Sequence, residues 1–307
     1  MEMVLCAKGL TKSYRGKKVL DGVSLNIARG DIYGFVGENG SGKTTVIRLI
    51  TGLIYAESGE FTLFGAGDKS NDILAARRRI GAIVESPSIY LNMSAKENLK
   101  MQAMILGIEA EEKIKAVLSL VGLGELYSDK KSAGNFSLGM RQRLGIAMAL
   151  IGDPEFIILD EPMNGLDPAG IVEVRELILK LNRERGITFL ISSHILSELS
   201  LVANKYGIIS HGRLIKEITA EELRAECKRT ISLEVDNAPA LSALLTANLR
   251  AVDFVMNEKG AMIFGNVRLN VLLRHIIDTG IEIKSVVCKD GTIEEYYLSV
   301  IGGGRNA

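Results

Sequence analysis

The segment GENGSGKT, residues 37–44, constrains the fold of this chain more than any other part of its sequence. It matches the spacing G-x-x-x-x-G-K-[ST] and lies between an apolar run expected to be a strand, residues 31–37, and a run with helical periodicity, residues 43–53. Glycines let such a loop curl, so that consecutive backbone N–H groups point at one anion. The segment therefore predicts a strand–loop–helix unit at the carboxyl edge of an open α/β sheet.

The residue types in this loop predict a phosphate site. Lys43 supplies a positive charge, and the hydroxyl of Thr44 is suited to Mg²⁺. An ordinary glycine-rich turn is the alternative, but it does not account for Lys43 and Thr44 at these positions between a strand and a helix. We expect the β- and γ-phosphates of a nucleotide to be bound by Gly37, Glu38, Asn39, Gly40, Ser41, Gly42, Lys43, Thr44 and Thr45.

Charged residues follow two further apolar strands. The strand of FIILDEP, residues 156–162, ends in Asp160 and Glu161, and adjacent strand residues point to opposite sides. We expect Asp160 to face Mg²⁺ and Glu161 to orient a water beyond the γ-phosphate for hydrolysis of a phosphoanhydride. His194 follows the strand at residues 187–193, and we expect it to contact the γ-phosphate and help hold that water. Each segment alone also fits a structural role, a charged turn or a structural histidine, but the ends of parallel strands meet at one edge.

Strands alternating with helices predict a mostly parallel sheet covered on both faces over residues 1–219. Three strands precede the first helix, and residues 94–152 are almost entirely helical in pattern, as in a helical insert. From residue 220 to residue 307 the pattern becomes strand, helix, strand, strand, helix, strand, helix, which is the order of a ferredoxin-like unit. We therefore expect a second, smaller α+β domain.

Composition limits the partners and the compartment. Lysine plus arginine and aspartate plus glutamate number 37 each, so no global charge attracts the chain to nucleic acid or anionic lipid. The three cysteines lie far apart without a C-x-x-C spacing, which is typical of a reducing compartment. No signal peptide and no apolar stretch of about 18 to 20 residues are present. We expect a cytoplasmic protein that reaches a membrane only through another polypeptide.

Five segments, GENGSGKT, FSLGMRQR, FIILDEP, NGLD and ISSH, resemble in their order the motifs of ABC-type ATPases, the nucleotide-binding subunits of ATP-binding cassette (ABC) transporters. The resemblance covers about residues 1–219. It implies the P-loop NTPase fold of an ABC cassette, with a RecA-like parallel core, an antiparallel β subdomain and a helical subdomain. It also implies ATP and Mg²⁺ as cofactors and a dimer of ATPase subunits.

The segment FSLGM corresponds to the family's signature element, written Leu-Ser-Gly-Gly-Gln in many members. This chain keeps Ser137 and Gly139 and departs at Phe136, Leu138 and Met140. The resemblance implies that Ser137 and Gly139 cap ATP bound to a second copy in a head-to-tail dimer. The segment alone also fits a simple helix cap. Because both halves of the ATP site are intact, we expect a homodimer.

The resemblance assigns roles to four further residues. The ring of Tyr14 would stack on adenine, although an ordinary strand aromatic is the alternative. Asn164 and Asp167, in NGLD, would belong to the loop that crosses the dimer interface and couples the two sites. Glu85 stands where members usually carry glutamine; it can still coordinate Mg²⁺ or a water, and it adds negative charge beside the triphosphate. Our hypothesis is that Glu85 links nucleotide state to the helical insert.

The chain is similar to ATPase subunits of bacterial exporters that confer bacitracin resistance or lantibiotic immunity. We therefore expect it to power export of a peptide antibiotic or another drug through a separate permease, which docks around residues 86–98. The alternative is a soluble ABC ATPase acting on ribosomes or DNA, but such members carry two cassettes or long coiled-coil inserts. A third hypothesis, compatible with the first, makes residues 220–307 a ligand-sensing or dimerising module.

Overall fold

The computed structural model describes residues 2–109, 111–227, 230–248, 253–257, 259–264 and 268–289, together with residues 293, 296, 297 and 300. The chain divides into two compact units, Met1–Ala220 and Glu221–Ala307. In the described part of the chain, no helix combines the length and the apolar composition that a membrane span requires. The larger unit contains the phosphate loop and therefore positions the candidate site.

A six-stranded sheet forms the centre of the larger unit, with the strand order β10-β9-β3-β8-β7-β6. Five neighbouring strands pair in parallel, and β10 pairs antiparallel with β9. Every residue of β3, β7 and β8 is buried, as expected for apolar strands covered on both faces. The carboxyl ends of these three strands therefore lie at one edge. The strands are β3 (Ile32–Val36), β6 (Ile80–Ile83), β7 (Phe156–Asp160), β8 (Thr188–Ser193), β9 (Lys205–Ser210) and β10 (Arg213–Thr219).

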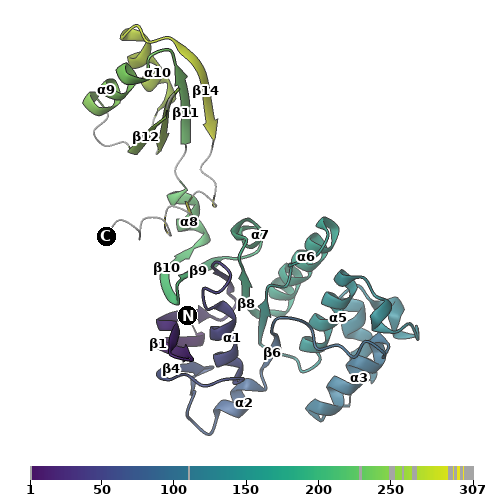
Figure 1. Ribbon diagram of the computed structural model, residues 1–307. Coiled ribbons are helices and arrows are strands. Elements are labelled where there is room, and N and C mark those ends of the chain that lie inside the picture. The colour runs from purple at the N-terminus through teal and green to yellow at the C-terminus, as the bar shows by residue number, and fades with distance from the viewer. Residues whose placement is uncertain are drawn as a thin grey trace. The chain divides into compact units, whose positions relative to one another are not determined.

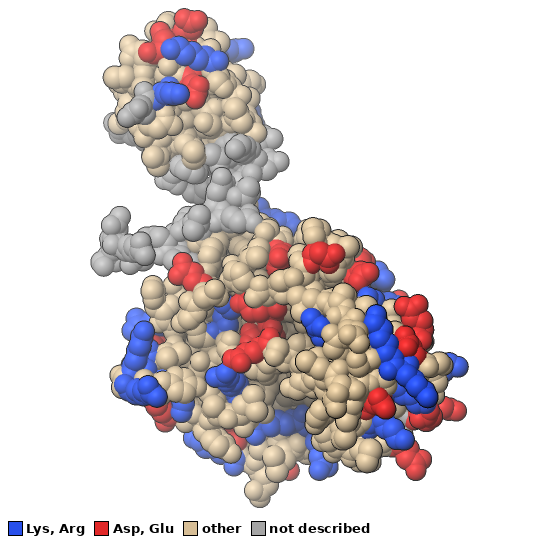
Figure 2. All heavy atoms as spheres, turned by 45° about the vertical axis from the view of Figure 1, so that its right-hand side comes forward, with Lys and Arg blue, Asp and Glu red and all other residues tan. Residues whose placement is uncertain are grey.

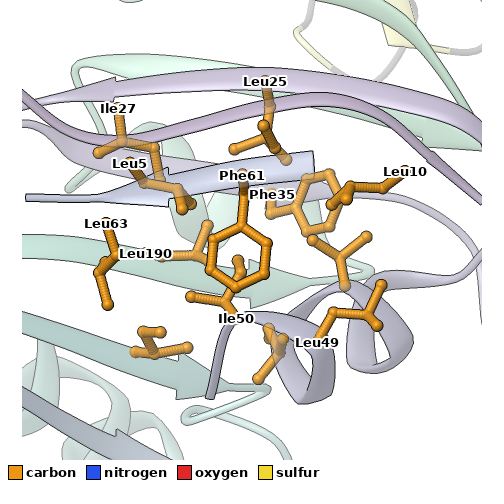
Figure 3. Packing of buried hydrophobic residues seen from close by; sticks show 14 of the residues in the cluster. Leu5, Leu10, Leu25, Ile27, Phe35, Leu49, Ile50, Phe61, Leu63 and Leu190 are labelled. Atoms are coloured by element: carbon orange, nitrogen blue, oxygen red, sulfur yellow. The ribbon is translucent and has the colours of Figure 1, made fainter. Parts of the chain in front are cut away.

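A second, antiparallel sheet packs over helix α1 (Lys43–Thr51), with the strand order β2-β1-β4-β5. Figure 3 shows Phe61 of this sheet pointing toward Ile50 of α1, with Leu190 of the parallel sheet nearby. Burial on both sides fixes the position of α1, and its N-terminus therefore stays at the phosphate loop. The strands are β1 (Met3–Tyr14), β2 (Lys17–Ala28), β4 (Ser58–Leu63) and β5 (Ala66–Gly67).

The helical insert consists of three packed helices and two short 3-10 turns. Figure 1 shows α3 and α5 side by side, and α4 packs against both. A capping box begins α3: Ser94 accepts from the N–H of Glu97, and Glu97 accepts from the N–H of Ser94. The elements are α3 (Ala95–Leu106), α4 (Glu111–Leu120), η1 (Gly124–Tyr127), η2 (Ala133–Asn135) and α5 (Leu138–Leu150).

Helices α6 (Pro168–Arg185) and α7 (Leu196–Ser200) complete the larger unit, together with short elements, and α8 (Ala220–Glu226) follows it. Helix α6 packs against α5, and α7 packs against β8. The sequence pattern did not predict β5 or the short helices α2 (Ile73–Arg77) and α8. These elements are too short to show a period.

The described part of the smaller unit contains a four-stranded antiparallel sheet with the order β12-β13-β11-β14, the strand order of a ferredoxin-like unit. Its core contains Leu233, Leu245, Ile263 and Ile276, all fully buried. The helix expected at residues 292–300 lies largely outside the described residues. The structure confirms the expected mostly parallel α/β core with an antiparallel β subdomain and a helical insert, followed by a smaller α+β unit. The elements are β11 (Thr230–Val235), α9 (Ala238–Asn248), β12 (Asp253–Asn257), β13 (Gly260–Phe264), α10 (Leu269–Asp278) and β14 (Ile283–Lys289).

Candidate active site

The phosphate loop connects the end of β3 to the start of α1, and its glycines permit its path. Gly40 and Gly42 have φ angles of +79° and +112°, in the region where side chains other than glycine are strained. A Cβ on Gly37 would lie 2.4 Å from the carbonyl oxygen of Ile209 and 2.5 Å from Ser41 Oγ. The loop therefore lies tightly against its neighbours and presents backbone rather than side chains.

The start of α1 supplies hydrogen-bond donors for an anion. The N–H of Val46 donates to the carbonyl of Gly42 at 3.0 Å, so the N–H groups of Lys43, Thr44 and Thr45 precede the first helical bond. Ser41 Oγ is buried and has no hydrogen-bond partner among the described residues. This donor set, at the positive end of a helix, fits a polyphosphate.

Lys43 is the positively charged group of this loop. Its side chain is 5% exposed, and Nζ donates to the carbonyl of Gly37 at 2.6 Å. Nζ also lies 3.2 Å from Glu161 Oε1. The ammonium is therefore held against the loop and is paired with the carboxylate that follows β7.

Asp160 is buried at the end of β7 and is oriented by two hydroxyl groups. Thr44 Oγ1 donates to Asp160 Oδ2 at 2.8 Å, and Ser192 Oγ donates to Asp160 Oδ1 at 2.5 Å. The partner Ser192 faces Asp160 because β7 and β8 pair in that register. The oxygens of Thr44 and Asp160 together form a hard-oxygen set of the kind that Mg²⁺ prefers. The sequence predicted no role for Ser192, because the segment ISSH that contains it pointed to His194.

Glu161 adopts a left-handed backbone conformation, with φ +51°. Its N–H donates to Ser192 Oγ at 2.9 Å, and its Oε2 lies 2.5 Å from His194 Nδ1. Strand alternation predicted that Asp160 and Glu161 point to opposite sides, yet both line one cavity. The reason is that β7 ends at Asp160 and the positive φ at Glu161 turns the chain.

These groups line a cavity of about 340 Å³ in front of the loop. Val19 lies near the start of β2 and is the one lining residue for which the sequence predicted no role. The lining residues are Val19, Asn39, Gly40, Gly42, Lys43, Thr44, Thr45, Glu85, Asp160, Glu161 and Asn164.

Several residues expected at the site lie outside the wall of this cavity. Tyr14, at the end of β1, is 40% exposed. Ser137 caps α5 by accepting from the N–H of Met140 at 3.2 Å, and Gly139 lies in the first turn of that helix. Asp167 caps α6 by accepting from the N–H of Gly170 at 3.1 Å. Gly37, Glu38 and Ser41 lie in the loop itself, and His194 contacts the site through Glu161.

Two acidic groups border the site from other elements. Glu85 follows β6 with φ +65°, lines the cavity and forms an ion pair with Arg48 of α1. Glu198, on α7, lines a small crevice with Glu161 and His194. Burial raises the pKa of Glu198 above its ordinary value; His194 opposes this effect and the charge of Glu161 adds to it.

Comparison with known proteins identifies the family. The sequence model of the ABC transporter family matches residues 20–164. The chain is 40% identical over 311 residues to the bacitracin transport ATP-binding protein of Bacillus licheniformis, and the alignment covers 99% of each protein. It is 44% identical over 214 residues to the lantibiotic transport ATP-binding protein of Streptococcus pyogenes, which covers 70% of this chain and 90% of that protein.

Solved structures agree. A Clostridium perfringens protein that is part of an ABC transporter complex superposes with a TM-score of 0.66 at 26% identity, covering 81% of this chain and 97% of that one. A dimeric ATP-binding cassette in a post-hydrolysis state, bound to ADP and phosphate, gives a TM-score of 0.63 at 25% identity, covering 70% of this chain and 98% of that one. With a nearly full-length relative at 40% identity, the chain belongs to the ABC transporter family, as an ATP-binding subunit with ATPase activity.

Proposed function

We propose that this chain binds ATP with Mg²⁺ and hydrolyses it as a homodimer, which powers export of a peptide antibiotic or another drug through a separate membrane permease. The observation that carries the hydrolysis is the placement of Glu161, whose two carboxylate oxygens contact Lys43 and His194. The substrate class comes from the bacitracin and lantibiotic transport proteins to which the chain is similar.

In this mechanism Lys43 and the first-turn N–H groups of α1 bind the β- and γ-phosphates. Thr44 and Asp160 would hold Mg²⁺, which supplies positive charge against the triphosphate when bound. Glu161 then orients a water and accepts its proton, because its carboxylate lies in the cavity wall. His194 holds Glu161 in position through Nδ1 and approaches the γ-phosphate from the end of β8.

The second half of each ATP site would come from the other copy. Ser137 is exposed at the N-terminus of α5 and lies outside the chain's own cavity, as does Gly139. A helix start that faces solvent can bind the γ-phosphate of a partner's nucleotide. Asn164 and Asp167 lie on the connection between β7 and α6, where we place the contact between the copies. The dimeric cassette to which the chain is similar supports this arrangement.

The permease would dock on a groove of about 290 Å³ beside the helical insert. Ser86, Pro87 and Ser88 line this groove, within the segment that sequence analysis assigned to permease docking. Leu106 of α3 also lines this groove, and it is 43% exposed. A groove with an exposed apolar side chain in its wall suits an amphipathic helix of a partner. The chain would then be cytoplasmic and peripheral on the inner face of the membrane.

No observation favours the alternative of action on ribosomes or DNA. The net charge is zero, and acidic and basic side chains occur together on the face of the larger unit seen in Figure 2. A nucleic-acid partner would instead call for a basic surface.

The test is copurification with a variant that keeps ATP bound. Glu161→Gln should bind ATP and hydrolyse it slowly, so that a complex purified from native membranes with ATP and Mg²⁺ persists. Mass spectrometry should then find a polytopic membrane protein in stoichiometric amount. Glu184→Gln, at an exposed site on α6, is the matched control and should recover less of this protein. Recovery of ribosomal or DNA-bound proteins without a membrane component would overturn the proposal.

A further inference from the structure

The ion pair between Arg48 and Glu85 joins two elements of the site that lie 37 residues apart. Arg48 lies four residues after Thr44 on α1, so the two side chains lie on the same side of the helix. The carbonyl of Arg48 accepts the N–H of Leu53 at 2.9 Å, which closes the end of α1 and fixes the backbone there. Glu85 lies in the cavity wall, and its guanidinium partner reaches it from α1.

The three carboxylates of the cavity wall each have a partner. Lys43 pairs with Glu161, and hydroxyl groups donate to Asp160. Arg48 forms an ion pair with Glu85, whose side chain is 61% exposed. Without such a partner, the negative charge of Glu85 in the cavity wall would repel the phosphates of a bound nucleotide. The repulsion would be strongest without a metal ion between them.

We propose that Arg48 is a positioning residue that compensates the charge of Glu85 and holds it in the cavity wall, so that a carboxylate is tolerated beside the nucleotide. Metal-bound nucleotide then competes with Arg48 for the same carboxylate, and this competition couples occupation of the site to the position of Glu85. The inference rests on the proposed function only in that the cavity binds ATP and Mg²⁺; it needs no permease.

The proposal predicts a larger loss of nucleotide affinity without metal than with it. Removing Arg48 leaves Glu85 unpaired, so metal-free nucleotide should bind more weakly. With Mg²⁺ present, the freed carboxylate no longer has a competing partner, so less of the affinity is lost. In a chain without the Glu85 charge, Arg48 has no charge to compensate. Its removal should then leave the nucleotide affinity unchanged, both with and without Mg²⁺.

The experiment measures the dissociation constant of a fluorescent, non-hydrolysable ATP analogue for the full chain, in excess EDTA and in excess Mg²⁺. The variants are Arg48→Ala, Arg48→Lys, Glu85→Gln and the double variant Arg48→Ala with Glu85→Gln. Lys113→Ala, which breaks an exposed ion pair with Asp153 away from the cavity, is the matched control. Thermal unfolding without ligand checks that every variant is folded.

We expect Arg48→Ala to weaken metal-free binding by about two- to five-fold, the range for exposed ion pairs. The loss with Mg²⁺ should be smaller, Arg48→Lys should restore at least part of the affinity, and Lys113→Ala should match the wild type. In the Glu85→Gln background, Arg48→Ala should change neither constant.

Two results would overturn the inference while leaving the proposed function intact. Equal weakening by Arg48→Ala in both Glu85 backgrounds would mean that Arg48 acts on the phosphates directly. An unchanged affinity in both backgrounds would mean that the pair compensates nothing. A wild-type chain that fails to bind the analogue with Mg²⁺ would overturn the proposed function as well, which distinguishes that failure from the other two.

Discussion

At the scale of single residues, the site depends on Ser192, whose hydroxyl contacts both Asp160, the last residue of β7, and Glu161, which follows that strand. It donates to Asp160 and accepts the N–H of Glu161, while the carbonyl of Ser192 accepts the same N–H at 3.2 Å. These bonds hold Glu161 in a left-handed conformation that costs free energy in a residue other than glycine. The hydroxyl therefore orients the carboxylate of Asp160 and holds the backbone of Glu161.

Ser192→Ala should consequently lower the rate of ATP hydrolysis more than removal of an exposed serine hydroxyl would. It leaves a buried oxygen of Asp160 without a donor, which costs about 1–3 kcal/mol of stability. We expect the rate of ATP hydrolysis to fall about ten-fold as the two acids lose their orientation. Steady-state hydrolysis and urea unfolding measure the two effects. Ser193→Ala, the adjacent strand position, removes a bond only to the N–H of Ile195 and should retain activity; equal losses in both variants would contradict this role.

Glu155 gives the chain a defined response to acid. It accepts from Arg79 and Arg29, which lower its pKa from 4.5 to about 2. Because the folded pKa lies below the unfolded value, its contribution to stability is present above about pH 4.5 and is lost as the pH falls toward 2. Screening by water limits this contribution to about 1 kcal/mol. Urea unfolding of Glu155→Gln between pH 7 and pH 3 should show a smaller fall in stability than the wild type; parallel curves would contradict the assignment.

The sequence predicts which residue types gather at the carboxyl edge, but not how they pair. Lys43, Asp160, Glu161 and His194 follow from motifs at strand ends. The contact of Ser192 with Asp160 depends on the register between β7 and β8, and the contact of Arg48 with Glu85 depends on the path of the chain after β6. No local sequence pattern predicts either contact, so only the structure reveals them.

At the scale of elements, long segments with clear periodicity and caps were predictable, whereas three short elements were not. Helix α2 has five residues, β5 has two and α8 has seven. A hydrophobic period needs a window of about 11–18 residues to emerge, so these elements are held by their packing instead. Helix α3 was predictable, because the spacing of Ser94 and Glu97 is typical of a capping box at a helix start.

Ser94→Ala therefore tests how much this capping box contributes. Ser94 Oγ accepts from the N–H of Glu97 at 3.3 Å, and Glu97 Oε2 accepts from the N–H of Ser94 at 2.7 Å. Loss of the cap should reduce the free energy of unfolding by about 1 kcal/mol. Nucleotide affinity should stay the same, because α3 does not line the cavity. Ser119→Ala, near the end of α4, is the control, and an equal loss there would show that the cap contributes nothing specific.

At the scale of the whole molecule, the chain contains two units whose described cores use different residues. The core around α1 is drawn from residues up to Leu214, whereas the core of the smaller unit runs from Ile231 to Val286. Sequence pattern predicts this change, because helix–strand alternation gives way to the ferredoxin-like order near residue 220. What residues 220–307 do is not encoded by a motif, so the ligand-sensing and dimerising hypotheses require a direct test.

A fragment that ends at Cys227 should fold and bind ATP, because every described residue that lines the nucleotide cavity belongs to residues 19–164. The full chain should unfold in two calorimetric transitions, and the fragment should keep only that of the larger unit. Sedimentation then separates the two hypotheses for the smaller unit. A dimerising module predicts that the fragment, with ATP and the Glu161→Gln substitution, associates more weakly than the full chain. A sensing module predicts equal association in that background and an altered rate of hydrolysis in the fragment that keeps Glu161. A fragment that does not fold would contradict the independence of the two cores, since the smaller unit would then be needed to complete the larger one.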